Sequence, residues 1–321
     1  MKRIIFAICT ILCANVLMAQ EQLATLKHND SISVYYGQNA FVEAYNAAAN
    51  GDIITLSDGI FNAPSTVQKG ITVRGNGAVA DTAQRKIGTY FMEIFDVQNL
   101  GDSLHFEAEG IYFALFRALS SFDTKLTRCY VDNMENCSGL QAMNCIIKGV
   151  VDGSSYINCV MLPEVYHLPH HAICNNCIIS GYEYDGYEYE SYPLYQFNNC
   201  VVIKKGASNT NTILNGAVNY SILIGFTGTN NPASSGNVFM SLSDVFENWD
   251  GGNISTDLET YVLKSSVSNS ILGLDGREVG IFGGAIPFDW TPTYSVKMRL
   301  DFPDTPDENG MLNIDVEFLT E

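Results

Sequence analysis

The sequence predicts an all-β protein built as a right-handed parallel β-helix, with an N-terminal capping α-helix and a C-terminal β-hairpin. Two observations carry this prediction: a short strand motif that recurs at irregular intervals, and chain ends that suit closure of a solenoid. A compact domain of 321 residues would usually divide in two, whereas a solenoid keeps one continuous core over this length.

The recurring motif is a cysteine or serine followed by aliphatic residues and usually preceded by asparagine. It occurs at Cys129, Cys145, Cys159, Cys177 and Cys200, and with serine at Ser221 and Ser270. The cysteines are 16, 14, 18 and 23 residues apart, which indicates coils with fixed strands and variable loops. We expect the small side chains to stack inside and the asparagines to bond to backbone at the bends. The pattern leaves open which of the two aliphatic residues points inward.

The N-terminal part predicts a helix that caps the first coil. Phe41, Ala44, Tyr45 and Ala48 follow helical spacing, and Gly51 then ends the helix before a strand at 53–56. An open solenoid end needs such a cover.

The C-terminal part predicts an antiparallel hairpin. Residues 296–302 and 312–318 alternate between apolar and polar side chains, with the turn-forming sequence PDTPDENG between them.

Three segments carry a family resemblance: AYNAAANGDIITLSDGIF, KGITVRGNG and LHFEAEGIYF. They resemble the start of secreted parallel β-helix proteins of the pectin-lyase-like superfamily. The late segments VGIFGG and PF look like those of uncharacterised Bacteroidetes members of that superfamily. The resemblance covers about residues 35–290 and implies the fold, whereas the superfamily includes lyases, hydrolases, adhesins and structural proteins.

The first 19 residues predict a secretory signal peptide, with Lys2 and Arg3 before an apolar run and cleavage after Ala19. The run is too short for a transmembrane helix, and no later stretch spans a bilayer. We therefore expect an exported protein that is periplasmic, on the outer surface or secreted. The expected units are the signal peptide 1–19, a lead segment 20–34, the β-helix with its cap 35–290 and the hairpin 291–321.

The charge excludes one class of partner. The formal charge is -18 and becomes -20 once residues 1–19 are removed, so nucleic acid is excluded and an anionic membrane is disfavoured. No cofactor motif is present, although calcium is possible.

The densest set of possible metal ligands or catalytic groups lies in YHLPHHAICNNC: His167, His170, His171, Cys174 and Cys177. Histidine and cysteine at this spacing can bind zinc, and His170 or His171 could act as a general acid or base. A solvated loop is the alternative. The calcium-binding aspartates of pectate lyases and the aspartate pair of polygalacturonases, which the resemblance would imply, have no counterpart.

The mature chain holds seven cysteines, an odd number, so one at least is unpaired in a monomer. We expect mostly reduced, buried thiols, because side chains stacked in parallel do not meet disulfide geometry. Cys137 and Cys174 lie outside the ladder and are the candidates for any bridge.

The segment GYEYDGYEYESYPLYQF predicts a projecting loop or hairpin with a ligand-binding role. Its tyrosines suit stacking on sugar rings, and its carboxylates can accept sugar hydroxyls or bind calcium. The candidate residues are Tyr182, Tyr184, Tyr187, Tyr189, Tyr192 and Tyr195, with Glu183, Asp185, Glu188 and Glu190 between them. A hairpin with a packed tyrosine face and a wet acidic face is the alternative.

A second contact is possible at NWDGGNISTD, where Trp249 could bind sugar beside Asp250, Asn253 and Asp257. The spacing does not match a calcium loop, and a turn is the alternative.

Three hypotheses follow. The preferred one is a secreted β-helix that binds a polysaccharide or another surface ligand through side loops. The second is a polysaccharide lyase or glycoside hydrolase that uses His170 or His171 with Glu183 or Asp185. The third is a structural or adhesive cell-surface protein. The oligomeric state is open.

Overall fold

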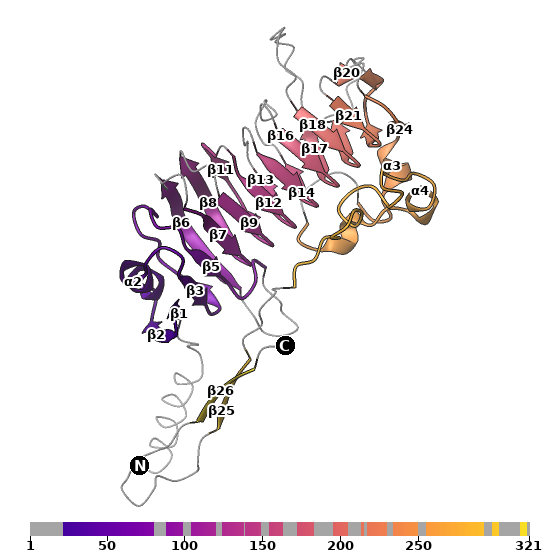
Figure 1. Ribbon diagram of the computed structural model, residues 1–321. Helices are drawn as coiled ribbons and strands as arrows, with labels where there is room; N and C mark the ends of the chain where they lie inside the picture. The colour runs from indigo at the N-terminus through magenta and orange to yellow at the C-terminus, as the bar shows by residue number, and fades with distance from the viewer. Residues whose placement is uncertain are drawn as a thin grey trace, which may run out of the picture.

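A computed structural model describes residues 22–79, 88–98, 104–119, 124–137, 139–148, 154–162, 172–182, 195–204, 213–214, 217–229, 234–249, 255–291, 297–301 and 315–319. Two 11-stranded sheets run along the molecule, and from β3 and β4 onward the strands of each sheet stack in parallel as a β-solenoid (Figure 1). The predicted fold class is confirmed.

One sheet, sheet A, begins with an antiparallel hairpin and continues with one strand from each coil. In spatial order its strands are β2 (Ser31–Tyr36), β1 (Leu23–His28), β3 (Ile53–Leu56), β5 (Thr72–Arg74), β7 (Phe106–Glu109), β9 (Thr124–Thr127), β12 (Gln141–Met143), β14 (Ser155–Ile157), β16 (Ala172–Asn175), β18 (Tyr195–Asn198) and β21 (Ala217–Asn219).

The other sheet, sheet B, takes the second strand of each coil. Its strands are β4 (Gly59–Ile60), β6 (Thr89–Gln98), β8 (Tyr112–Leu119), β10 (Tyr130–Val131), β13 (Ile146–Lys148), β15 (Val160–Leu162), β17 (Ile178–Tyr182), β19 (Val201–Lys204), β22 (Ile222–Ile224) and β24 (Val238–Met240), with β11 (Met134–Glu135) beside β8. A short pair, β20 (Ile213–Leu214) and β23 (Gly228–Thr229), lies outside both sheets.

The corner between the two sheets explains the recurring asparagine. Asn144, Asn158, Asn176 and Asn199 have φ of 54°, 49°, 54° and 56°, in the left-handed region where asparagine is among the best-tolerated residues. One residue in this conformation turns the chain from sheet A into sheet B.

The cysteine after each corner points inward and pairs with backbone. The N–H of Cys177 donates to Cys200 Sγ at 3.4 Å, and the N–H of Cys200 donates to Ser221 Oγ at 3.0 Å. Each thiol also donates to the carbonyl two residues earlier, as Cys200 does to Asn198 at 3.2 Å. A small side chain that both accepts and donates is therefore required here, which is why serine substitutes at Ser221.

The two aliphatic residues after each cysteine face opposite ways, and both are buried. Ile179 and Val202, the second of each pair, lie in the core between the sheets. Ile178 and Val201, the first of each pair, lie on the outer face of sheet B in a second apolar cluster.

The predicted N-terminal cap is confirmed as α2 (Ala40–Ala47). Phe41 and Ala44 are fully buried, and the Phe41 ring packs edge-on against Phe91 with centroids 5.0 Å apart. Lys69 Nζ donates to the carbonyls of Tyr45 (2.6 Å) and Ala48 (2.8 Å) at the helix C-terminus, where a positive charge is favoured.

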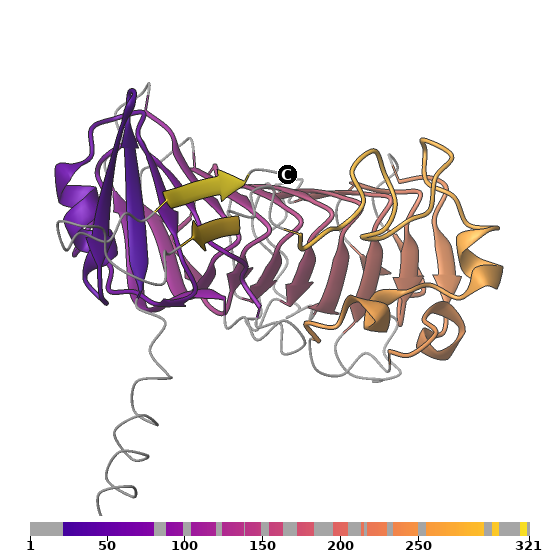
Figure 2. The ribbon, with the colours of Figure 1, turned by 90° about the horizontal axis from the view of Figure 1, so that it is seen from below.

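Among the described residues after β24, the chain forms no further coil. It makes the short helices α3 (Leu242–Val245), η1 (Leu258–Tyr261) and α4 (Ser265–Ser268), and then runs back along the solenoid (Figure 2). Ser270 follows α4 and does not mark a coil, so that member of the sequence alignment is wrong.

The predicted C-terminal hairpin is confirmed as a separate antiparallel pair, β25 (Lys297–Asp301) and β26 (Asp315–Leu319).

Candidate functional site

The corner side chains hold a returning C-terminal segment, residues 273–291, which we call the strap. Asn158 Nδ2 donates to the carbonyls of Ile281 (2.7 Å) and Gly283 (2.8 Å). The N–H of Leu274 donates to Asn199 Oδ1 at 2.9 Å. The side chains of these asparagines therefore bond to the strap, whereas the sequence predicted bonds to backbone at the bends.

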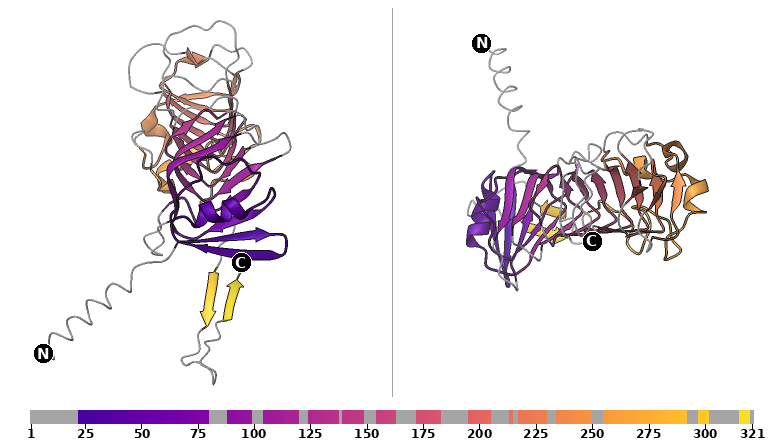
Figure 3. Two further views of the ribbon diagram at one scale, coloured as in Figure 1. Left: turned by 90° about the vertical axis from the view of Figure 1, so that its left-hand side faces the viewer. Right: turned by 90° about the horizontal axis from the view of Figure 1, so that it is seen from above.

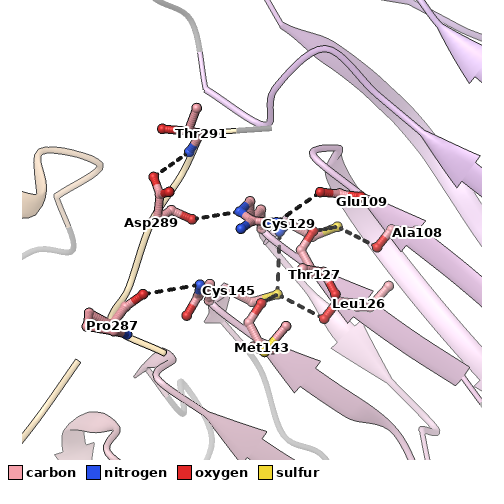
Figure 4. A network of polar contacts seen from close by, with 12 residues as sticks. Ala108, Glu109, Leu126, Thr127, Cys129, Met143, Cys145, Pro287, Asp289 and Thr291 are labelled. Atoms are coloured by element: carbon pink, nitrogen blue, oxygen red, sulfur yellow. Dashed lines mark hydrogen bonds and ion pairs between the residues drawn. The ribbon is translucent and has the colours of Figure 1, made fainter. Parts of the chain in front are cut away.

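The strap crosses the coils in reverse order. Beyond Asn158, the amide of Asn144 donates to Pro287 O at 3.5 Å and Arg128 Nε donates to Asp289 O at 3.1 Å. Figure 4 shows the Pro287 and Asp289 carbonyls directed at the corners beside Cys145 and Cys129. One segment thus joins coils far apart in the sequence.

Glycines allow the strap to approach the corners closely. A Cβ on Gly283 would lie 2.8 Å from Asn176 Nδ2 and 1.6 Å from the carbonyl oxygen of Glu278 within the strap. Gly284 has φ of +75°, and a Cβ there would lie 2.9 Å from Asn176 Oδ1. Only glycine fits such sites without a backbone shift. The sequence VGIFGG is thereby explained as a docking segment.

Apolar side chains complete the docking. Val279, Ile281 and Phe288 belong to the same buried apolar cluster as Ile178 and Val201, on the outer face of sheet B. Gly280 lies against this face: a Cβ there would be 3.4 Å from Val201 Cγ2 and 3.9 Å from Ile178 Cγ1. Fully burying one such side chain is worth about 1.5–3 kcal/mol, so the strap and the sheet depend on each other for stability.

Two carboxylates of the strap have opposite pKa shifts. Burial raises the pKa of Glu278. Burial also raises that of Asp289, but hydrogen bonds from Thr291 and the charge of Arg128 outweigh it and leave the pKa lowered. The Arg128 guanidinium also pairs with Glu109 at 2.9 Å.

The outer column of sheet B continues beyond the strap as a row of tyrosines. Tyr90, Tyr112 and Tyr130 are in register, and successive ring centroids are 5.2 Å apart. Tyr130 is buried, whereas Tyr90 and Tyr112 are half-buried and Ile60, next in the column, is exposed. This row was not predicted from the sequence. The available signal was position: Tyr112 follows the corner residues Gly110 and Ile111, and Tyr130 follows Arg128 and Cys129.

A charged pair lies beside this row. Lys148 Nζ contacts Asp132 Oδ1 at 2.5 Å and lies 5.6 Å from the centre of the Tyr130 ring. Burial lowers the pKa of Lys148, but hydrogen bonds with Asp132 and Tyr130 outweigh it and raise the pKa. Burial and the charge of Asp132 raise the pKa of the Tyr112 hydroxyl. The row offers hydroxyls and a fixed charge pair to a ligand.

The segments with the predicted ligand-binding and histidine residues attach to one side of the solenoid. Residues 163–171 join β15 to β16, and residues 183–194 join β17 to β18. The flanking strands are in register, with Val160 beside Ile178 and Ala172 beside Tyr195. Adjacent strands lie about 4.8 Å apart, so the two segments start and end on neighbouring coils.

Most of the predicted site residues lie outside the described part of the chain. These are Tyr184, Tyr187, Tyr189, Tyr192, Glu183, Asp185, Glu188, Glu190, His167, His170 and His171. The backbone of Tyr182 ends β17. Tyr195 is buried, and its ring stacks on Phe197 with centroids 4.4 Å apart.

Trp249, from the second predicted contact, lies among aromatic side chains. Trp249 is 6% exposed and packs edge-on against Phe246 and Tyr261, with centroids 4.9 and 5.1 Å apart. Asp250 and Asn253 lie outside the described residues, and Asp257 caps η1 by accepting from the N–H of Glu259. Binding by Trp249 stays a prediction.

All seven cysteines of the described chain are buried free thiols, including Cys137 and Cys174. Burial raises the pKa of Cys137 to about 12 and also raises that of Cys174, whose Sγ lies 3.9 Å from Met161 Sδ. High thiol pKa values disfavour the reactive thiolate. Within the described ranges, no group of three or more His, Cys, Asp or Glu residues is arranged to hold a metal ion.

Comparison with known proteins identifies no relative: no family model matches the chain, and neither do the curated proteins or the solved structures searched. The resemblance to the pectin-lyase-like superfamily stays a prediction, while the β-solenoid itself is shown. In the described part of the chain, no helix is long and apolar enough to cross a membrane.

Proposed function

We propose that this β-solenoid acts outside the cytoplasm and binds a polysaccharide or another surface ligand through the loops on one side of its coils. The observation that supports the proposal is the register of β15, β17 and their partners, because it attaches the tyrosine segment and the histidine segment to neighbouring coils. A rigid scaffold that carries adjacent loops is a frequent arrangement for binding.

The chemistry of the two segments suits a glycan. Tyrosine rings stack on sugar faces, and carboxylates accept sugar hydroxyls or hold calcium. The half-buried Tyr90 and Tyr112 on sheet B add a second row of hydroxyl groups. With a formal charge of -18, a neutral or calcium-bridged polymer is a better ligand than a bare polyanion.

Affinity electrophoresis through gels that contain plant, bacterial and host polysaccharides tests this proposal. We expect one polymer to retard the protein, with the retardation lost in a Tyr184→Ala/Tyr187→Ala variant. Phe substitutions at the same positions keep the ring and serve as the matched control. Failure of every polymer to retard the protein would contradict the glycan proposal.

A polysaccharide lyase or glycoside hydrolase is the alternative, because the same register attaches the segment with His170 and His171 and the segment with Glu183 and Asp185 to neighbouring coils. Release of new reducing or unsaturated ends from the retained polymer, lost in His170→Ala or His171→Ala, would favour the enzyme. Retention without product would favour the binder.

A further inference from the structure

The N-terminal end of sheet A is an open edge. β2 is its outermost strand and pairs with β1 on one side, while no described strand pairs with its other side. Figure 3 shows this hairpin at the end of the solenoid in the left view.

The other sheet ends are shorter. β2 has 6 residues, whereas β21 and β24 have 3 each and β4 has 2. Asn219 of β21 is also bridged to Ser235. Among the described strands, the largest free hydrogen-bonding edge at a sheet end is thus that of β2.

The alternation of hydrogen-bonded pairs between β1 and β2 shows which backbone groups of β2 do not bond to β1. The N–H of Gly37 donates to Gln22 O at 2.8 Å, just beyond the pairs Tyr35–Ala24 and Ser33–Leu26. Hydrogen-bonded pairs alternate in an antiparallel ladder, so the odd-numbered residues of β2 bond to β1. The N–H and C=O groups of Ile32, Val34 and Tyr36 therefore point to the open edge.

The same three residues carry exposed apolar side chains. Ile32 is 61%, Val34 41% and Tyr36 58% exposed. The strand SISVYY has no proline and no charged residue, which are the usual devices that keep an edge strand from pairing.

We propose that β2 is a self-association surface at which two copies of this chain pair through an antiparallel β2–β2 contact. The twofold register places Val34 opposite Val34 and Ile32 opposite Tyr36 of the second copy. These are hydrogen-bonding positions on both strands, so each free N–H and C=O of Ile32, Val34 and Tyr36 gains a partner.

Side-chain chemistry favours a second copy as the occupant. Antiparallel partners lie on the same face, so apolar side chains meet apolar side chains across the twofold axis. In this register Asp30 lies opposite Gln38 of the second copy. The contact therefore places no two like charges opposite each other, although the chain as a whole is acidic. The result is one sheet A that continues through both solenoids, end to end.

Sedimentation velocity of the mature full-length chain tests the proposal, at loading concentrations from about 1 μM to about 1 mM. We expect a monomer–dimer equilibrium that Val34→Lys shifts to monomer by at least about tenfold in Kd, because two ammonium groups would meet at the axis. Ile173→Lys is the matched control: Ile173 is 40% exposed, also faces outward on sheet A, and lies outside the contact.

The register is tested by introduced cysteines. Under copper–phenanthroline oxidation, two Val34→Cys thiols should lose their protons and electrons to the oxidant and form a covalent dimer, because residue 34 faces itself. Ser33→Cys faces Tyr35 of the second copy and should not cross-link.

A monomer at every concentration, a dimer that tolerates Val34→Lys, or equal cross-linking of both cysteine variants would overturn the proposal. So would a monomer whose Val34 amide is protected from exchange, since another segment of the same chain would then cover β2.

Discussion

The two sheets of the solenoid differ in what covers their outer faces. In one coil, β16 alternates, with Ile173 exposed and Cys174 buried, whereas Ile178 and Ile179 of β17 are both buried. The outer face of sheet A meets solvent at Ile173, while the strap covers the part of sheet B that holds Ile178 and Val201. Loss of alternation in a strand therefore reports that a further segment packs on it.

The largest expected effect comes from a charge placed on the covered outer face of sheet B. Ile178→Asp buries a carboxylate without a partner under the strap, and we expect a loss of about 3–5 kcal/mol in the free energy of unfolding. Urea denaturation measures it through the midpoint.

Ile173→Asp in the preceding strand of the same coil is the control for this prediction. Its side chain is 40% exposed on sheet A, and we expect a cost of at most about 1 kcal/mol. Equal losses for the two variants would contradict the difference between the faces.

The second largest expected loss of stability follows from removing the corner contact that holds the strap. Asn158→Ala removes the donors to Ile281 O and Gly283 O and puts alanine at a φ of 49°, so we expect a loss of about 2–4 kcal/mol. Asn158→Gly keeps the backbone conformation and should lose less. Hydrogen exchange of the strap amides, compared with those of sheet A, measures where stability is lost; unchanged strap protection in Asn158→Ala would refute the assigned role.

The inward-pointing column of cysteines concerns both sheets, because each of its thiols lies at the corner between sheet A and sheet B. Cys200→Ala leaves the N–H of Cys177 without its acceptor and should cost about 1–3 kcal/mol. Cys200→Ser should cost less, because Ser221 already fills the equivalent position in the next coil with an N···O distance of 3.0 Å. Thermal unfolding of both variants gives the order, and a less stable serine variant would contradict it.

The smallest expected effect is the pH dependence of the strap. The raised pKa of Glu278 means that its ionisation disfavours the fold, so stability is lost as pH rises from the unfolded value through the raised folded value. Glu278→Gln should raise the urea midpoint at neutral pH and leave it unchanged in acid.

Asp289 has the opposite sign. Its lowered pKa contributes stability above the unfolded value, and this contribution is lost as pH falls through the folded value. Asp289→Asn should therefore reduce the midpoint at neutral pH and flatten its decrease in acid. If both variants shift the midpoint in the same direction at neutral pH, the assigned pKa directions are wrong.

The order of coils follows from local patterns that the sequence contains. The cysteine ladder, the capping helix with Phe41 and Ala44, and the strand Ile53–Leu56 were all predicted, because each depends on residues close together in the chain. The candidate site stays a prediction: its tyrosines and histidines were chosen by composition, and no local pattern fixes how segments from different coils meet.

The chain by itself determined the corner and the core. In the coils of Asn144, Asn158, Asn176 and Asn199, an asparagine that tolerates a left-handed φ, followed by a small donor–acceptor side chain, sets where the coil turns and what points inward. Only the tertiary structure decided which aliphatic residue of each pair faces out and why that residue is apolar. The reason is that the strap lies over Ile178 and Val201 at Gly280, although it follows them much later in the chain, and no local pattern encodes a contact over such a separation.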